Sequence, residues 1–284
     1  MQVPRLTRTT GLSAKKIMHT AVGVAILFGV MSTAIAQDSD NPDEVPVQLR
    51  TLTLNGNLPD ALRQQIVSSL QGGEFYTGGL QERVRQKMRD AGYYEARVLD
   101  PEQTDVKQQE GIEIVDVSVR VVPGDLYKLG EIKITGASAF PSDQLRKQFP
   151  VESGSLFNEA AVSKGLDQLK TLYQSQGYVN FGAIPRGDVD EEHHIVNLTI
   201  EIDEGGLVNF GHLILDGVEP RAGAAKSLTD SWKDLAGKRY SPELLKQWLA
   251  ANTSDWPKDA IDQIRTENSP DPDPHVVNVV VHFQ

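Results

Sequence analysis

Two clusters of histidine and carboxylate residues are the first candidates for chemistry in this sequence. His193 and His194 follow Glu191 and Glu192, and the segment 271–275 reads Asp-Pro-Asp-Pro-His. Both clusters contain ligand types used by Zn²⁺ or Ca²⁺. Adjacent residues of a strand point to opposite faces, so the two imidazoles are badly placed to share one ion. We interpret both clusters as acidic turns, with a calcium contact at 271–275 as the minor alternative, and expect no metal or cofactor.

The residue types of nucleophilic catalysis are also present, but their spacing gives no reason to combine them. Ser227, Ser231 and His212 could form a triad only if the fold brought them together. The sequence has no nucleophile elbow, phosphate-binding loop or His-Glu-x-x-His helix. We therefore expect a protein that is not an enzyme, with a secreted hydrolase as a minor alternative.

Charge and cysteine content exclude further classes of function. The chain has 28 basic and 39 acidic residues, a net charge of −11, and no cysteine. Disulfides and thiolate chemistry are thus excluded. Strong acidity disfavours nucleic acid and anionic membrane surfaces as partners, because both attract clustered positive charge.

The first 36 residues have the pattern of a signal peptide. A basic start is followed by an apolar run at 21–30 and by Ala34-Ile35-Ala36, a small-residue cleavage site. An uncleaved anchor is the alternative, but the run is short for a bilayer span. Cleavage would remove Arg5, Arg8, Lys15 and Lys16 and leave a net charge of −11 − 4 = −15. Residues 37–46 are acidic, contain proline and are expected to form a flexible leader.

The rest of the chain repeats nearly the same pattern three times. Alternating apolar strands end at Gly56, Gly136 and Gly217, so the period is 136 − 56 = 80 and then 217 − 136 = 81 residues. Each repeat closes on a second alternating strand, at 112–124, 195–205 and 276–283. A period of this length is typical of a small domain rather than of a solenoid repeat. A tandem binding array is therefore expected.

The second repeat gives the clearest order of elements. We expect a strand at 132–135, a short helix after Ser142, a second helix capped by Asn158, and a stop at Gly177. The second helix has an apolar stripe made of Val162, Leu166, Leu169 and Tyr173. A strand opened by Tyr178 and the closing strand follow. The predicted order is strand, helix, helix, strand, strand.

The other repeats follow this order, and together they define the domains. In the first repeat Gly92 ends the second helix before Tyr93-Tyr94, whereas the third repeat lacks this join and its middle strand is expected at 261–265. The predicted domains are a signal peptide (1–36), a leader (37–46), two similar domains (47–126 and 127–206) and a divergent third (207–284). Short links between them predict an elongated rod.

Four short motifs of the second repeat identify its family. In order they are Gly130-Glu131-Ile132-x-Ile134-x-Gly136 with Phe140, Gly154-x-x-Phe157-Asn158, Tyr173-x-x-x-Gly177-Tyr178, and Val196-x-Leu198-x-Ile200-x-Ile202-x-Glu204-Gly205. Together they resemble the POTRA (polypeptide-transport-associated) domain, as in BamA-like and TamA-like outer-membrane assembly factors. The first repeat shares most of this pattern, and the third shares its first and last strands.

The resemblance implies an α+β fold of tandem β-α-α-β-β units, each a three-stranded mixed sheet with two helices on one face. In the relatives such repeats precede a membrane β-barrel. Here too few residues follow for even about eight strands, so we expect the repeats without the barrel.

The resemblance also implies that the strand after the second helix lies at a sheet edge, where an extended polypeptide can be added. The candidate binding residues are Tyr93, Tyr94, Ala96, Val98, Tyr178, Val179 and Phe181.

The function expected from the resemblance is a periplasmic, chaperone-like scaffold that assists outer-membrane protein assembly or export. Its partners would be unfolded outer-membrane polypeptides, or a separate barrel protein that holds the scaffold at the membrane. No nucleic acid and no membrane span after cleavage are expected. The alternative is an adaptor that binds one folded partner in a division or secretion complex.

Overall fold

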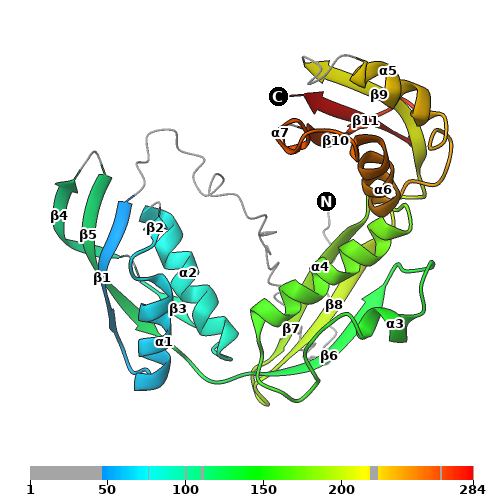
Figure 1. Cartoon of the computed structure of the whole chain (residues 1–284). Coiled ribbons are helices and arrows are strands. Elements are labelled where there is room, and N and C mark those ends of the chain that lie inside the picture. Colours follow the sequence, from blue (N-terminus) through cyan, green and yellow to red (C-terminus); the bar gives the residue numbers. More distant parts are fainter. Residues whose placement is uncertain are drawn as a thin grey trace, which may run out of the picture.

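The computed structural model describes residues 47–75, 77–99, 101–109, 112–217, 223–262 and 264–283. The predicted signal peptide and acidic leader lie outside these residues. Within them, no helix combines the length and the hydropathy that a membrane-spanning helix requires. The described chain forms three units that follow one another along a path bent at both joints (Figure 1).

Unit 1 contains a five-stranded sheet. Its elements are β1 (Val47–Asn55), α1 (Asp60–Leu70), β2 (Glu74–Phe75), α2 (Thr77–Asp90), β3 (Arg97–Val98), β4 (Glu102–Gln109) and β5 (Ile112–Val122). The prediction of three strands is wrong here, because β2 adds a two-residue strand beside β1 and the edge strand beside β5 is divided into β3 and β4.

Units 2 and 3 each contain a three-stranded sheet. Unit 2 consists of β6 (Lys128–Thr135), α3 (Ser142–Arg146), α4 (Glu159–Ser175), β7 (Gly182–Asp190) and β8 (Ile195–Asp203). Unit 3 consists of β9 (Asn209–Gly217), α5 (Ala224–Trp232), α6 (Pro242–Thr253), α7 (Lys258–Ile261), β10 (Ile264–Pro270) and β11 (Val276–Phe283). Its middle strand begins at Ile264, after the short α7, so the prediction of a strand at 261–265 is wrong at Ile261 and Asp262 and right at Ile264 and Arg265.

The three sheets share one topology. The last strand of each unit is central, with the first strand parallel to it on one side and the middle strand antiparallel on the other. The parallel pairs are β1–β5, β6–β8 and β9–β11. The antiparallel pairs are β4–β5, β7–β8 and β10–β11. This is the β-α-α-β-β order that the sequence pattern predicts, with the mixed sheet that the family resemblance implies.

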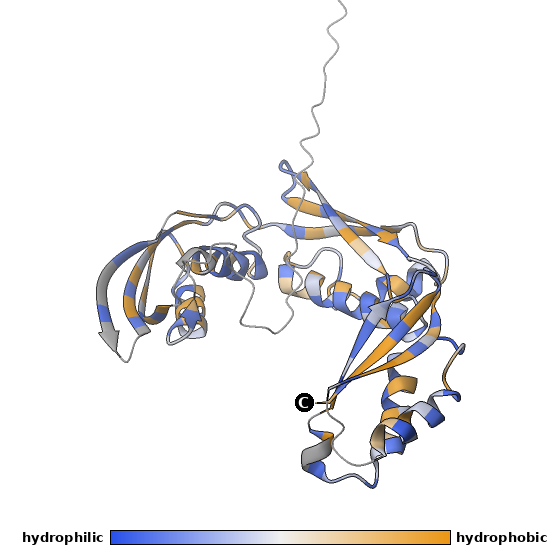
Figure 2. Cartoon of the chain, turned by 90° about the horizontal axis from the view of Figure 1, so that it is seen from above, coloured by the Kyte–Doolittle hydropathy of each residue, from blue (hydrophilic) through white to orange (hydrophobic). Residues whose placement is uncertain are grey.

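Each unit builds its own core from one face of its sheet and the helices on it. Along β8, buried Val196, Leu198, Ile200 and Ile202 alternate with more exposed residues, and Figure 2 shows hydrophobic and hydrophilic residues mixed along the strands and helices. The predicted stripe of α4 packs into the same core. The three cores are separate hydrophobic clusters.

The glycines that end the first strands occupy equivalent positions, as predicted. Gly136 has φ +81°, and a Cβ added there would lie 2.1 Å from the carbonyl oxygen of Ile202 at the end of the central strand. A Cβ added at Gly56 would lie 2.2 Å from the carbonyl oxygen of Val121, and one added at Gly217 would lie 2.2 Å from that of Phe283. Only glycine allows this positive φ together with so close an approach of the backbones.

Candidate functional site

The outer edge of each first strand is covered at its start by the chain's own backbone. In unit 2, the N–H of Gly154 donates to the carbonyl of Leu129 at 2.6 Å, and the N–H of Leu129 donates to the carbonyl of Ser155 at 2.9 Å. The equivalent bonds join Leu49 with Gly72 and Gly73 in unit 1, and Phe210 with Gly237 and Lys238 in unit 3. The segment before the second helix therefore occupies this edge near the start of the strand in all three units.

The opposite edge of each sheet is open. Within the described part of the chain, β4, β7 and β10 each pair with a strand on one side only. An edge strand presents unpaired N–H and C=O groups to which another extended chain can be added. β7 is the longest of the three, and all nine of its residues pair with β8 without a register shift.

The residues of β7 indicate which of its backbone groups face outward. Pro185 lies opposite Ile200 on the central strand. Proline has no N–H, and within a sheet it is confined to positions where none is needed, so we infer that its nitrogen faces away from β8. By the alternation of antiparallel pairing, the N–H groups of Ala183, Gly187 and Val189 face outward as well.

The side chains of β7 also favour this edge. Ile184 is 58% exposed on the strand, and Arg186 forms an ion pair with Glu201 of β8 at 2.9 Å. An exposed apolar side chain beside an open edge gives an added strand something to cover. Exposed charged residues, which oppose strand addition, occur on both strands, as Arg186 and Asp188 on β7 and as Arg265 and Glu267 on β10. The exposed Ile184, however, has no large apolar counterpart on β10. β7 is thus the best candidate site.

The aromatic residues predicted to open the edge strands lie before those strands instead. After α4, the N–H of Tyr178 donates to the carbonyl of Tyr173 at 3.1 Å and that of Gly177 donates to Gln174 at 3.1 Å, a Schellman motif. A turn follows, in which the N–H of Phe181 donates to the carbonyl of Tyr178 at 3.2 Å. The strand itself begins at Gly182. Assigning Tyr178, Val179 and Phe181 to a strand is therefore wrong.

Unit 1 repeats this local structure. The N–H of Tyr93 donates to the carbonyl of Met88, and the N–H of Ala96 donates to the carbonyl of Tyr93, both at 3.1 Å. Tyr93, Tyr94 and Ala96 thus precede the edge strand, and among the predicted residues only Val98 lies in one, as a buried residue of β3.

The second residue after each helix-ending glycine packs against the next unit. Tyr94 belongs to the hydrophobic cluster of unit 2, where its ring lies 4.9 Å from that of Phe157. Val179 packs against the cluster of unit 3. The glycines also bind the following link: the carbonyl of Gly92 accepts from the N–H of Tyr127 at 2.8 Å, and that of Gly177 accepts from Val208 at 3.0 Å. These positions hold the units together.

The joint between units 1 and 2 has further polar contacts. The carboxylate of Asp90 at the end of α2 accepts from the N–H of Ala160 at 2.8 Å, so unit 1 caps a helix of unit 2. Arg89 lies 3.4 Å from Glu159, whose other carboxylate oxygen is buried and has no hydrogen-bond partner. Burial raises the pKa of Glu159, although Arg89 opposes the rise. These contacts couple the two units.

Glu204, at the end of β8, orders the loop before α3. Its carboxylate accepts from the N–H groups of Ser138 and Ala139 at 2.8 Å, from the Ser138 hydroxyl at 2.5 Å and from the Tyr173 hydroxyl at 3.0 Å. Burial raises the pKa of this carboxyl, but the hydrogen bonds from Ala139 and Ser138 outweigh it and lower the pKa to about 2.

We expect Glu204→Gln to destabilise unit 2 by about 2 kcal/mol at pH 7, because hydrogen bonds to a charged group are lost. The folded pKa lies below its ordinary value of 4.5. The stabilisation is therefore present above that value and is lost as the pH falls towards about 2. Urea unfolding of both proteins between pH 7 and pH 3 checks this. A stability difference that does not shrink with acidification would contradict it.

The histidine and acidic clusters considered for chemistry have other partners. His193 Nδ1 lies 2.8 Å from Asp190, whereas His194 Nε2 lies 3.4 Å from Asp125, so the two rings face different carboxylates. Asp271 accepts from the N–H of Asp273 at 3.0 Å and from the Asn278 amide at 2.9 Å. In the described ranges, no three His, Cys, Asp or Glu side chains are grouped so as to hold a metal ion.

Comparisons with known proteins agree with this architecture. A family model for POTRA, described as surface antigen variable number repeat, matches residues 127–205. A protein of Treponema pallidum (strain Nichols), named as an outer membrane protein assembly factor, is 24% identical over 204 residues, which are 63% of this chain and 24% of that protein. Outer membrane protein assembly factor BamA of Neisseria meningitidis is 22% identical over 185 residues, or 60% of this chain and 23% of BamA.

The match to a solved structure concerns the fold. POTRA domains 3 to 5 of Haemophilus influenzae BamA superimpose with a TM-score of 0.61 at 17% identity, covering 85% of this chain and 98% of that structure. Residues 127–205 therefore form a POTRA domain. The chain as a whole has the fold of tandem POTRA domains and is related to outer-membrane assembly factors. The matched region spans about a quarter of the length of these two relatives.

Proposed function

We propose that this protein is a periplasmic scaffold that holds extended polypeptides at the open edges of its sheets, chiefly at β7, and so assists outer-membrane protein assembly or export. The observation that carries the proposal is the asymmetry of the edges. In every unit a loop pairs with the start of the first strand, whereas among the described residues no segment pairs with the outer edge of the middle strand. Such asymmetry directs strand addition to one side of each sheet.

The names of the relatives support a role in outer-membrane protein assembly. Both matched curated proteins are named as outer membrane protein assembly factors. Pairing through the main chain tolerates many sequences, which suits a chaperone-like role towards unfolded outer-membrane chains. Export through the signal peptide at 1–36 would place the protein in the periplasm, where a separate assembly protein could hold it at the outer membrane.

The alternative proposal is an adaptor for one folded partner. The polar contacts between α2 and α4 support it, because a fixed joint presents a surface of constant shape. A scaffold of this kind would not depend on the outward N–H groups of β7. The two proposals can therefore be separated at that strand.

We expect Gly187→Pro to weaken the binding of an extended peptide about tenfold, since one main-chain hydrogen bond is lost and the ring obstructs the edge. The probe is a fluorescent ten-residue peptide that alternates valine with threonine, measured by anisotropy. Gly187→Ala keeps the N–H and is the matched control, expected to bind like wild type. Equal binding by the folded proline variant would exclude strand addition at β7 and favour the adaptor.

A further inference from the structure

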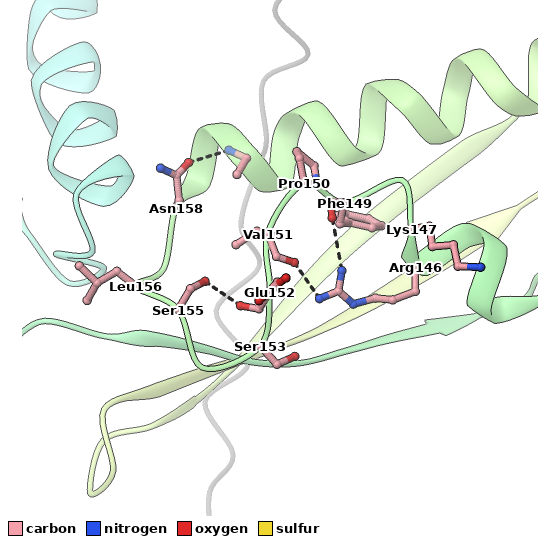
Figure 3. Close-up of a pocket in the computed structure, with 11 residues that line it drawn as sticks. Arg146, Lys147, Phe149, Pro150, Val151, Glu152, Ser153, Ser155, Leu156 and Asn158 are labelled. Carbon is pink, nitrogen blue, oxygen red and sulfur yellow. Dashed lines mark hydrogen bonds between the residues drawn. The ribbon is translucent and has the colours of Figure 1, made fainter.

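A hollow of about 1070 Å³ lies in unit 2, between the end of α3, the segment that leads to α4, and the first turn of α4. Its lining includes Arg146, Lys147, Phe149, Val151, Leu156 and Ala161 (Figure 3). This segment contains residues 154 and 155, which pair with Leu129 near the start of β6. Because β6 and β7 are opposite edges of the sheet, the hollow, called here the α3–α4 groove, is separate from the proposed strand-binding site.

The walls of the α3–α4 groove are fixed by packing and hydrogen bonds. Phe149 is buried against α4, where a Cβ in place of Gly165 would lie 2.2 Å from its ring. Arg146 donates to the carbonyl oxygens of Phe149 at 3.4 Å and of Val151 at 2.8 Å, which holds the segment in an open curve (Figure 3). The groove is therefore preformed, as binding sites commonly are.

An exposed apolar patch continues from the groove across the joint. Leu156 and Leu126 are 49% and 46% exposed. Both lie over Gly92 of unit 1, since a Cβ there would be 3.2 Å from Leu126 and 3.4 Å from Leu156. A cluster of exposed apolar side chains surrounded by polar residues often marks an interaction site, whereas a single exposed apolar side chain does not.

Two exposed lysines, Lys147 and Lys164, stand beside the groove on a chain of net charge −11. Lys147 is paired weakly with Asp143 at 3.8 Å, and both side chains are 77% exposed. Lys164 is exposed one turn of α4 beyond Ala161, on the same side of the helix. In the part of the chain that the structure describes, no carboxylate lies within 4 Å of the charged nitrogens of Arg146 or Lys164. Glu152 is the single acidic residue of the lining.

We propose that the α3–α4 groove docks a short segment of a separate partner protein, in which a large apolar side chain stands between acidic residues. The apolar side chain would cover Leu156 and Val151, and the carboxylates would face Lys147 and Lys164. The pairing of charges carries this choice, because Lys147 and Lys164 are exposed beside the groove and can each face a carboxylate of the partner.

The chain's own acidic residues before Val47 fit this role less well. Val47 lies opposite Glu113 on β5, nine residues before Val122, which leads to the joint. Nine residues of strand span about 30 Å, so Val47 lies about this far from the joint and from the groove beyond it.

The experiment uses two fluorescent ten-residue peptides, one with leucine and phenylalanine between aspartates and one in which lysine replaces every aspartate. Anisotropy gives affinity, and amide shifts of the ¹⁵N-labelled three-unit chain locate the contact. We expect only the acidic peptide to bind and to shift amides of residues 149–164. Lys147→Glu and Lys164→Glu should each weaken it about fivefold. Lys170→Glu, on another face of α4, is the matched control and should bind like wild type.

Several results would overturn the proposal. These are no binding of the acidic peptide, equal binding of both peptides, equal loss in the Lys170→Glu control, and shifts confined to β7. If deletion of residues 37–46 alone shifted the amides of the groove, its occupant would be the chain itself. If the shifts depended on protein concentration without peptide, the occupant would be a second copy.

Discussion

Ile200→Pro is expected to unfold unit 2. Ile200 is fully buried on the central strand β8, between Ile134 of β6 and Pro185 of β7. Proline there removes a ladder N–H and forces its ring into a strand paired on both sides, at a cost of about 3 kcal/mol or more. A unit of this size has a total stability of about 4–12 kcal/mol. Loss of the buried isoleucine side chain lowers the free energy of unfolding further.

The measurement is hydrogen exchange of the amides in β5, β8 and β11, one central strand from each unit. Those of β8 should exchange freely in the variant, whereas β5 and β11 should remain protected because their cores are separate clusters. The native Pro185 shows that the edge position opposite Ile200 accepts proline. Gly187→Pro on the same edge strand is the matched control and should leave β8 protected. Protected β8 amides in Ile200→Pro would contradict the assignment of β8 as the central strand.

Tyr173→Ala is expected to cost about 4 kcal/mol, as the truncation of a fully buried aromatic residue commonly does. The Tyr173 ring is stacked on Phe181 at 4.3 Å and meets Phe140 and Tyr178 edge-on at 4.9 and 5.5 Å. Its hydroxyl donates to Glu204. The residue thus joins α4, the turn before β7 and the end of β8, and its loss should loosen all three.

Tyr173→Phe is the matched control for this substitution. It keeps the ring contacts and loses only the hydrogen bond to Glu204, so it should cost about 1–2 kcal/mol. Urea unfolding, followed by the fluorescence of the tyrosines and by exchange of the β8 amides, separates the two variants. Equal destabilisation by both would mean that the hydroxyl, and not the packing of the ring, holds this end of the unit.

The fold was predictable from local signals because these signals agree with one another. Asn158 caps α4 as predicted, its side chain accepting from the N–H of Ala161 at 2.7 Å. The three glycines at 80- and 81-residue intervals mark the same contact with the central strand. Periodicity and caps act within a few residues, so they can be read without knowing the rest of the chain.

The residues after the helix stops could not be assigned by strand propensity. Aromatic and β-branched residues favour strands, but a Schellman motif also favours an apolar residue directly after its glycine. Tyr93 and Tyr178 fill that position and pack against their own units. The motif therefore predicts a turn, and the strand follows it.

The interdomain role of Tyr94 and Val179 had no local signal. Each packs against a cluster whose other residues lie in the next unit, tens of residues further along the chain. The division of the edge strand of unit 1 into β3 and β4 likewise depends on its pairing with β5. Contacts of this kind are set by tertiary structure, which overrides local preference.

Protection of the outward amides of β7 is the most direct test of the proposed scaffold. Hydrogen exchange of Ala183, Gly187 and Val189 is measured in the ¹⁵N-labelled chain, with and without a saturating ten-residue peptide that alternates valine and threonine. We expect the peptide to slow exchange at these three amides by about tenfold or more. Each of these N–H groups would donate a hydrogen bond to the main chain of the added strand or lie next to one that does. Unchanged exchange along β7 in the saturated complex would contradict it.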